Sequence, residues 1–421
     1  MPALLWFRRD LRLGDHPALA SASGAAGGGE VLACFVLDPR LEASSGRRRL
    51  QFLGDSLRQL RDDLDGRLLV VRGNPEVDIP RIAKEISASS VHISHDFAPF
   101  GRRRDERVRA ALDPVPLVAT GSPYLVSPGR VTKKDGSHYQ VFTPFFRNWR
   151  EVGWRPPARS GLGSAHWVDP SQLRIKRCKV PDPGVALDRA AGEATARKQW
   201  KSFVDDRLKR YGEDRNRPDL EGTSAMSAHL KFGAIHPRTM VADLDLCGIG
   251  AQTYLRELAF RDFYADVLHH RPASAWRNWN SNFDAIQTDT GAEAKRRFEA
   301  WKAGETGFPL VDAGMRQLRE TGFMHNRVRM VVASFLVKDL HLPWQWGAEW
   351  FLDQLVDGDM ASNQHGWQWC AGCGTDAAPY FRVFNPITQA EKFDPSGDYV
   401  RRWIPELTDA DDVHLRKDAR P

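Results

Sequence analysis

The first 125 residues alternate between short apolar runs and helix-length amphipathic stretches such as Arg49–Leu64 and Glu76–Ile86. This alternation constrains the fold more than any other feature of the sequence. Apolar strands that alternate with helices predict a parallel sheet with helices on both faces. The apolar runs are residues 4–7, 31–37, 68–71, 91–93 and 116–118. We therefore expect an α/β domain over residues 1–125, with a doubly wound parallel sheet that binds ligands at the carboxyl ends of its strands.

The remainder of the chain has a different character. Prolines recur between residues 126 and 190 too often for a long helix, which predicts an extended interdomain linker with one short helix at 142–149. From residue 191 to 421 apolar residues recur at three- and four-residue spacing, which predicts an all-helical domain. All fourteen tryptophans except Trp6 lie at or after Trp149. The predicted helices are 197–209, 252–268, 292–303, 311–320, 327–340 and 346–355.

The totals exclude several classes of protein. No apolar run approaches the roughly 20 residues that a membrane-spanning helix needs, and no cationic leader precedes the first apolar residues. Five cysteines do not suggest a disulfide framework. Cys370 and Cys373 lack a second pair at metal-ligand spacing, so we expect no metal. A net charge of +6 favours a polyanionic partner. We expect a cytoplasmic monomer without an obligate protein partner.

Chemistry-bearing residues are densest over 357–386, DGDMASNQHGWQWCAGCGTDAAPYFRVFNP. Asp357 and Asp359 place two carboxylates around a glycine, where a ligand can approach the backbone. Arg382 lies between two phenylalanines. A polar surface loop beside a tryptophan-rich core is the alternative for any one of these residues. Residues 222–227, GTSAMS, put three hydroxyls before an apolar helical run. Such a segment suits either phosphate binding or an ordinary helix N-cap.

Taken together, residues 357–386 resemble the flavin-binding signature of the cryptochrome/photolyase family. The wording GTDAAPYFRVFNP is most similar to the class I cyclobutane pyrimidine dimer (CPD) photolyases. The opening LLWFRRDLRLGDHPAL and the stretch from Trp301 to Met330 extend the resemblance, which runs from Leu4 to Leu407. It implies a helical FAD-binding domain behind the α/β domain. The implied activity is that of a deoxyribodipyrimidine photo-lyase, which repairs dimers in double-stranded DNA with light.

The resemblance also implies the cofactor site. FAD, active as FADH⁻, would be flanked by Arg329 and Asp357 as a buried ion pair. Asn363 would face flavin N5, where its amide can donate or accept. Signalling cryptochromes commonly carry Asp or Cys at that position, so Asn363 favours repair. The cofactor-binding residues implied are Tyr211, Thr223, Ser224, Ala225, Met226, Ser227, Tyr254, Arg261, Arg329, Asp357, Gly358, Asp359 and Asn363.

The implied catalytic residues are Glu257, Asn326, Met330 and Asn363. Glu257, in its protonated form, and Asn326 would hold the pyrimidine carbonyls as preorganised donors. The (6-4) photolyases carry histidines at the positions of Asn326 and Met330, so these two residues favour CPD repair. Tyr254 and Phe260 depart from the tryptophans that class I enzymes usually carry. The implied DNA- and lesion-binding residues are Arg215, Glu257, Phe260, Asn326, Arg327, Trp369, Arg382 and Gln389.

Two further parts of the family pattern are incomplete. Trp367 and Trp344 match the first two members of the electron-transfer chain of tryptophans, but the third position falls near Gly291. Trp276, Trp279 or Trp301 could replace it. Residues 96–105 are similar to the loop that binds a deazaflavin antenna, so we expect an 8-hydroxy-5-deazaflavin type of antenna, with folate (MTHF) as the alternative.

Two other functions fit the sequence less well. A blue-light receptor of the same fold would bind FAD and signal without repair. Phe260 and the uncertain third tryptophan favour it, whereas Asn326, Met330 and Asn363 oppose it. A light-independent flavin oxidoreductase would need a nicotinamide site, and the chain has no G-x-G-x-x-G fingerprint.

Overall fold

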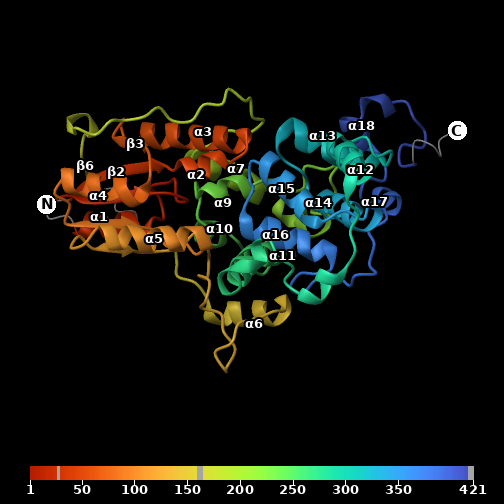
Figure 1. The fold of residues 1–421 in the computed structure, drawn as a ribbon, viewed down its shortest axis with the longest axis horizontal. Helices are drawn as coiled ribbons and strands as arrows, with labels where there is room; N and C mark the ends of the chain where they lie inside the picture. Colours follow the sequence, from red (N-terminus) through yellow and green to blue (C-terminus); the bar gives the residue numbers. More distant parts are fainter. Residues whose placement is uncertain (26–28, 159–164, 416–421) are drawn as a thin grey trace.

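The computed structural model describes residues 1–25, 29–158 and 165–415. An α/β half and a helical half lie side by side (Figure 1). The α/β half contains one parallel sheet with strand order β3-β2-β1-β4-β5, and a short strand β6 pairs with β2. This confirms the predicted doubly wound sheet. The strands are β1 (Ala3–Phe7), β2 (Glu30–Leu37), β3 (Leu68–Arg72), β4 (Ser90–Ile93), β5 (Leu117–Ala119) and β6 (His166–Trp167).

Helices cover both faces of the sheet because successive side chains of a strand point to opposite sides. Leu5 of β1 packs in one core with Phe52 of α3, whereas Leu4 packs in another core with Ile79 of α4. The predicted loop over residues 96–105 is wrong from Pro99 onward, where a proline at the first helical position begins α5. The helices of this half are α1 (Pro17–Ala25), α2 (Pro39–Ala43), α3 (Arg47–Asp63), α4 (Pro75–Glu85) and α5 (Pro99–Ala111).

The segment that we predicted as a linker contacts both halves. Its helix α6 (Phe142–Val152) buries Phe142, Phe145 and Trp149 against the helical half. The chain then adds β6 to the sheet, forms the short 3-10 helix η2 (Pro170–Gln172) and runs along α3 towards α7 (Figure 1). The boundaries at residues 125 and 190 stay a prediction.

Among the described residues the helical half has two large cores, one around α11 and one around α13, α14 and α16, and a small cluster packs α11 against α16. The predicted helix over 327–340 is α14 followed by a π-helical turn, η6. Among the residues described, no helix is both long enough and apolar enough to cross a membrane. The elements are α7 (Glu193–Asp206), η3 (Leu208–Arg210), α8 (Tyr211–Asp214), α9 (Ser227–Phe232), α10 (Pro237–Ala242), α11 (Ile249–His270), η4 (Pro272–Ala275), η5 (Ser281–Ala285), α12 (Gly291–Ala303), α13 (Pro309–Thr321), α14 (Asn326–Ser334), η6 (Phe335–Asp339), α15 (Trp344–Gln354), α16 (Met360–Ala371), α17 (Pro386–Phe393), α18 (Asp398–Trp403) and η7 (Pro405–Leu407).

The loop after β1 joins the two halves. The backbone N–H of Leu11 donates to the carbonyl of Phe232, and the guanidinium of Arg12 donates to the carbonyl of Gly233, both at 3.0 Å. Asp15 accepts a bond of 2.7 Å from Arg238 in α10. These contacts fix the carboxyl end of β1 against α9 and α10, and thereby place both halves around one site.

Two buried carboxylates of α11 hold the start of the linker. Asp262 is 2% exposed and accepts from the backbone N–H of Val126 at 2.8 Å and from the indole of Trp149 at 3.0 Å. Burial raises the pKa of Asp262 to about 7, although these bonds oppose the shift. One turn later, Asp266 accepts from the N–H of Gly129 at 2.6 Å, and burial raises its pKa to about 6.

We expect Asp262→Asn to flatten the pH dependence of stability. Because the folded state raises the pKa of Asp262, it binds a proton that the unfolded chain has already released, so stability falls as the pH rises from about 4 to about 7. An asparagine oxygen can still accept from the same donors but does not titrate. Urea unfolding across this pH range should show a smaller loss of stability for the variant than for the native chain. Asp205→Asn, at an exposed position, is the control, and equal slopes for all three proteins would contradict the prediction.

Candidate functional site

The segment from Asp357 to Asp359 enters α16 at the junction of the two halves. Asp359 caps the helix by accepting from the N–H of Ser362 at 3.2 Å. The same carboxylate binds Arg9 at 2.6 Å and lies 3.7 Å from the ammonium of Lys231. Burial disfavours the charge, but Arg9 and Lys231 hold the pKa of Asp359 well below its usual range. The site therefore begins with a fixed negative charge between two cations.

The pKa of Lys231 lies well below the ordinary value of a lysine. Burial, and then the neighbouring guanidinium of Arg9, lower the pKa of Lys231 to about 7, although Asp359 opposes the shift. Neither Arg9 nor Lys231 was among the predicted site residues. Their positions follow from the packing of the β1 loop against α9, which no local spacing in the sequence encodes.

The predicted pairing of Arg329 and Asp357 is present. The guanidinium of Arg329, on α14, donates to Asp357 at 3.0 Å and to the carbonyl of Met324 at 2.7 Å. Burial disfavours the charged carboxylate, but Arg329 and the hydroxyl of Ser227 lower the pKa of Asp357. An arginine held in this way presents a permanent positive charge beside α16.

The residues predicted for the diphosphate gather at the start of α9. Ser227 is the first residue of this helix, and Ala225 before it has a φ of 52°. The hydroxyls of Ser224 and Tyr254 are 2.9 Å apart, and the ring centroids of Tyr211 and Tyr254 are 5.2 Å apart. Tyr254, which departs from the family's tryptophan, thus gains a hydrogen bond that an indole ring could not make in the same way. Thr223 and Met226 lie in the loop before α9, and Gly358 lies in the loop before α16.

Asn363 lies on α16, one turn after the cap. Its amide nitrogen donates to the carbonyl of Ala348 at 3.0 Å and to the side-chain oxygen of Gln364 at 2.7 Å. Since both bonds use the nitrogen, the side-chain oxygen is the group that Asn363 offers to a ligand.

Glu257 pairs with an arginine, but not with the one four residues later. The carboxylate binds Arg215 at 2.6 Å. Burial raises the pKa of Glu257, and Arg215 opposes the shift. Arg261 points elsewhere: it donates to the carbonyl of Pro123 at 2.7 Å and lies over the ring of Tyr124 at 4.6 Å. Arg215, predicted to contact DNA, is thus already bound within the protein.

Four of the predicted lesion-site residues, Phe260, Asn326, Met330 and Trp369, lie on α11, α14 and α16, and both α11 and α14 pack against α16. Phe260 stacks on Phe142 of the linker helix α6, with ring centroids 3.5 Å apart and planes 6° apart. Asn326 and Met330, one turn apart on α14, are in contact at 4.0 Å. Trp369 stacks on Phe384 at 6.1 Å.

The predicted DNA-binding side chains differ in how exposed they are and in whether they already bind other residues. Arg327 donates to Asn216 at 2.9 Å and covers the ring of Phe393 at 4.4 Å. Arg382 is exposed, next to Phe381, which is 85% exposed, and Gln389 is half-buried on α17. Arg382 is therefore the most accessible of these side chains.

Of the tryptophans considered for electron transfer, Trp301, Trp344 and Trp367 are buried. Trp367 has ring centroids 5.0 Å from Phe351 and 6.1 Å from Trp301. The indole of Trp344 donates to Asn278 at 2.8 Å. Trp301 is fully buried, whereas Trp276 is 44% exposed.

Cys370 and Cys373 are both buried at the end of α16, and burial raises the pKa of each thiol to about 12. Thiols in this state are poor metal ligands and poor nucleophiles near neutral pH.

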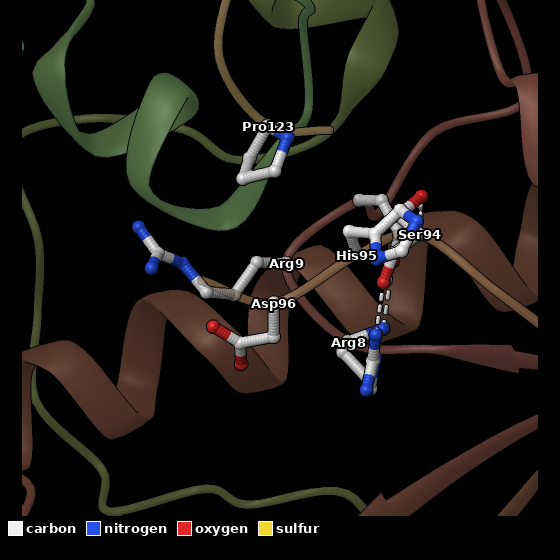
Figure 2. Close-up of a pocket in the computed structure, with 7 residues that line it drawn as sticks. Arg8, Arg9, Ser94, His95, Asp96 and Pro123 are labelled. Carbon is white, nitrogen blue, oxygen red and sulfur yellow. Dashed lines mark hydrogen bonds between the residues drawn. The ribbon is translucent and has the colours of Figure 1, made fainter. Parts of the chain in front are cut away.

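A small cavity lies at the carboxyl ends of β1 and β4, the point of the sheet from which the strand order runs in both directions. Figure 2 shows Pro123 facing Arg9 and Asp96 across it, while Arg8 turns towards Ser94. Arg8 also binds Asp105 at 2.6 Å. Burial disfavours the charge of Asp96, but Arg104 and Arg9 lower its pKa. Through Arg9 this cavity is continuous with the ion pair at Asp359.

Comparisons with known proteins agree with this geometry. The family described as DNA photolyase matches residues 3–161, and the FAD binding domain of DNA photolyase matches residues 254–420. A deoxyribodipyrimidine photo-lyase of Thermus thermophilus is 41% identical over 96% of this chain and 92% of its own length. The chain belongs to the DNA photolyase family. The predicted family and enzyme class, a deoxyribodipyrimidine photo-lyase, are confirmed.

Solved photolyase-family structures share the whole fold. The Synechocystis cryptochrome has a TM-score of 0.88 and 31% identity, and covers 98% of this chain and 91% of its own. A Sulfolobus tokodaii photolyase with two FAD molecules has a TM-score of 0.85 and 31% identity, covering 97% and 91%. The predicted order of an α/β domain before a helical FAD-binding domain is confirmed.

The residues at this site carry the chemical groups that FAD binding needs. Arg329 offers a cation, Asn363 a free amide oxygen, and Ser224 and Ser227 hydroxyls at the start of α9. A side-chain carbon built at Gly366 of α16 would meet no atom within 4 Å, so protein does not fill the space beside this helix. Two of these groups meet at Asp357, which accepts from Arg329 and from the hydroxyl of Ser227, while Asn363 and Gly366 lie one turn apart on α16.

We expect Arg329→Met to weaken FAD binding by roughly tenfold or more, the value of one charged hydrogen-bonding group. The variant keeps the apolar stem but removes the cation beside Asp357. Equilibrium titration of the apoprotein with FAD measures the effect. Arg319→Met, on the exposed side of α13, is the control, and equal FAD affinities of the two variants would contradict the expectation.

Proposed function

We propose that this photolyase repairs cyclobutane pyrimidine dimers by passing one electron from excited, reduced FAD to a dimer extruded from double-stranded DNA. The supporting observation is that two packed helices each carry both kinds of residue. On α14, Arg329 of the flavin side lies between Asn326 and Met330 of the lesion side. On α16, Asn363 precedes Trp369 by less than two turns. The packing of α14 on α16 supports one shared cavity for cofactor and dimer.

When bound, reduced FAD supplies the electron after it absorbs light. The protein's part is to hold the dimer and to stabilise the charge that arrives on it. Asn326 donates through its amide, and Glu257 donates in its neutral form, which its raised pKa favours. The cyclobutane ring then opens, and the electron returns, so the reaction consumes only light. A dimer leaves the stack at lower cost than an intact base pair because it is already poorly stacked.

In this proposal the protein binds DNA through contacts of its cations with phosphates, and not through contacts with the edges of the bases. Arg382 and Arg327 lie beside the lesion side of the site, and contacts of cations with phosphate give affinity without sequence preference. Arg215 serves Glu257 instead of phosphate in this proposal. Trp369 and Phe260 supply apolar walls for the dimer. We further propose that the protein acts as a cytoplasmic monomer.

Electron supply to oxidised FAD would use Trp367 and Trp344. We propose Trp276 as the outer member, because it is 44% exposed and its carbonyl contacts Gln345, next to Trp344. Trp301 is fully buried, so it suits a relay beside Trp367 but not an exit to solvent.

The region at Arg8, Arg9 and Asp96 is proposed as the antenna site; the cavity there is about 10 Å³, so the surrounding side chains must move to admit a chromophore. A second FAD occurs in the Sulfolobus tokodaii photolyase, where it implies a novel light-harvesting cofactor. For this chain the 8-hydroxy-5-deazaflavin type remains the proposal, with folate as the alternative. Alternating guanidinium and carboxylate groups at this cavity suit a polar planar ligand.

A blue-light receptor is the second candidate. The observation in its favour is that Phe142 already covers one face of Phe260, the ring proposed to stack on the dimer. Asn326, Met330 and Trp369 remain on the lesion side and support repair.

We expect Glu257→Gln to retain repair and to remove a pH dependence. A neutral amide keeps a donor, whereas raising the pH deprotonates the native carboxyl and ends its donation, so the repair yield of the native chain should fall with pH while that of the variant stays flat. Glu257→Ala should lose roughly tenfold in yield or dimer affinity. The assay illuminates reduced protein with dimer-containing oligothymidine and follows the recovery of ultraviolet absorbance.

Glu305→Gln, at an exposed position, is the control. An unchanged yield in Glu257→Ala would remove the proposed role of this acid. Absence of repair by the native chain with FAD bound would favour the receptor.

A further inference from the structure

The helix α14 does not continue as an α-helix beyond its last residue. It passes into the π-helical turn η6, in which the N–H of Leu340 donates to the carbonyl of Phe335, five residues earlier, at 3.0 Å. Turns of this kind are rare, and they occur frequently at functional sites. Phe335 and Leu336 are buried in the core, whereas Lys338 is half-buried at its edge. The turn therefore places a cation at the surface, directly after a helix of the site.

Lys338 contacts the loop between α16 and α17. Its ammonium donates to the carbonyl of Arg382 at 2.6 Å and lies 5.9 Å from the centre of the Tyr380 ring. Ser334, the last residue of α14, binds the same loop, because its hydroxyl accepts from the N–H of Phe384 at 3.2 Å. The end of α14 and the turn after it thus hold the backbone on both sides of the Arg382 guanidinium.

This loop buries little of its own surface. The side chains of Tyr380, Phe381 and Val383 are 43%, 85% and 50% exposed. Fixing the backbone of a segment costs conformational entropy, and burial of apolar area normally offsets that cost. Because the offset is small here, the conformation of the loop depends on its hydrogen bonds to α14 and η6.

The position of Lys338 is not that of a lysine that only makes the surface soluble. Such a side chain would extend into water, away from other cations. Lys338 instead lies partly buried next to Arg382, and burial together with that guanidinium lowers the pKa of Lys338, although Cys370 and Asp339 oppose the shift. Its bond to the loop carbonyl stabilises a placement that desolvation and like charge disfavour.

We propose that Lys338 is a positioning residue for DNA binding, which holds the loop so that the guanidinium of Arg382 meets a phosphate beside the extruded dimer. The inference rests on the proposed function, in which Arg382 contacts DNA. A loop that is already ordered in the free protein does not lose that freedom on binding, so affinity rises. The guanidinium itself lies over the ring of Phe384 at 5.6 Å, which orders the side chain as well as the backbone.

The test compares Lys338→Met with Lys302→Met. Lys302 of α12 is also half-buried and also lies over an aromatic ring, that of Trp350 at 4.8 Å, but it pairs with Glu299 and not with the loop. Each change removes one positive charge and keeps an apolar stem. Fluorescence anisotropy in the dark measures the affinity of the FAD-loaded protein for a dimer-containing duplex, and illumination at saturating duplex measures the repair yield.

We expect Lys338→Met to bind the duplex about tenfold more weakly than the native chain, as loss of one charged hydrogen bond does, with an unchanged repair yield at saturation. Lys302→Met should bind normally. Lys338→Arg should recover most of the affinity, because a guanidinium can donate to the same carbonyl. Equal affinities of Lys338→Met and Lys302→Met would overturn the inference.

A double-mutant cycle with Arg382→Gln separates positioning from a direct contact of Lys338 with phosphate. If Lys338 acts through Arg382, adding Lys338→Met to Arg382→Gln should weaken binding by no more than about twofold further. Losses that multiply would show that the two cations act independently, and would overturn the positioning role. Failure of the native chain to bind the duplex would overturn the proposed function itself, and the inference with it, so the two failures are distinguishable.

Discussion

The ion pair between Arg9 and Asp359 joins the α/β half of the molecule to the helix that carries the site. Arg9 follows the first strand of the sheet, and Asp359 caps the helix that carries Asn363, Gly366 and Trp369. A half-buried carboxylate is stabilised by a partner of opposite charge, and Arg9 comes from the other half of the chain. The helix that bears the site therefore has its starting point fixed by the sheet. Lys231 adds a second cation, with its own pKa lowered to about 7 by burial and by Arg9.

This ion pair also links the cavity at β1 and β4 to α16. Arg9 lines that cavity and binds Asp359, which caps α16. The carboxyl ends of parallel strands are where ligands bind in such sheets, and here that edge faces the helical half directly. A ligand in this cavity would thus be placed relative to α16 by Arg9 and its contacts.

Much of the fold was predictable because it rests on local pattern. The apolar runs gave five strands, and the three- and four-residue spacing gave the main helices of the second half. The pairing of Arg329 with Asp357 was also predictable, since a buried charge needs a partner. What could not be predicted depends on contacts between distant segments. Arg215 pairs with Glu257 across two elements, Arg261 turns towards Pro123, and Phe142 of the linker covers Phe260. None of these follows from spacing, because each is decided by where the linker and α8 pack on α11.

Because of this packing between distant segments, the effect of a replaced residue at the site depends on the neighbours that contact it. Phe260 is smaller than the tryptophan usual in class I photolyases, yet it is backed by Phe142, and Arg256 lies over that ring at 5.0 Å. The wall at this position therefore consists of two stacked rings with a cation beside them. Tyr254, at the other replaced tryptophan, is held by Ser224. At both positions a residue from another segment contacts the smaller ring, and this contact offsets part of the contact area that a tryptophan would provide.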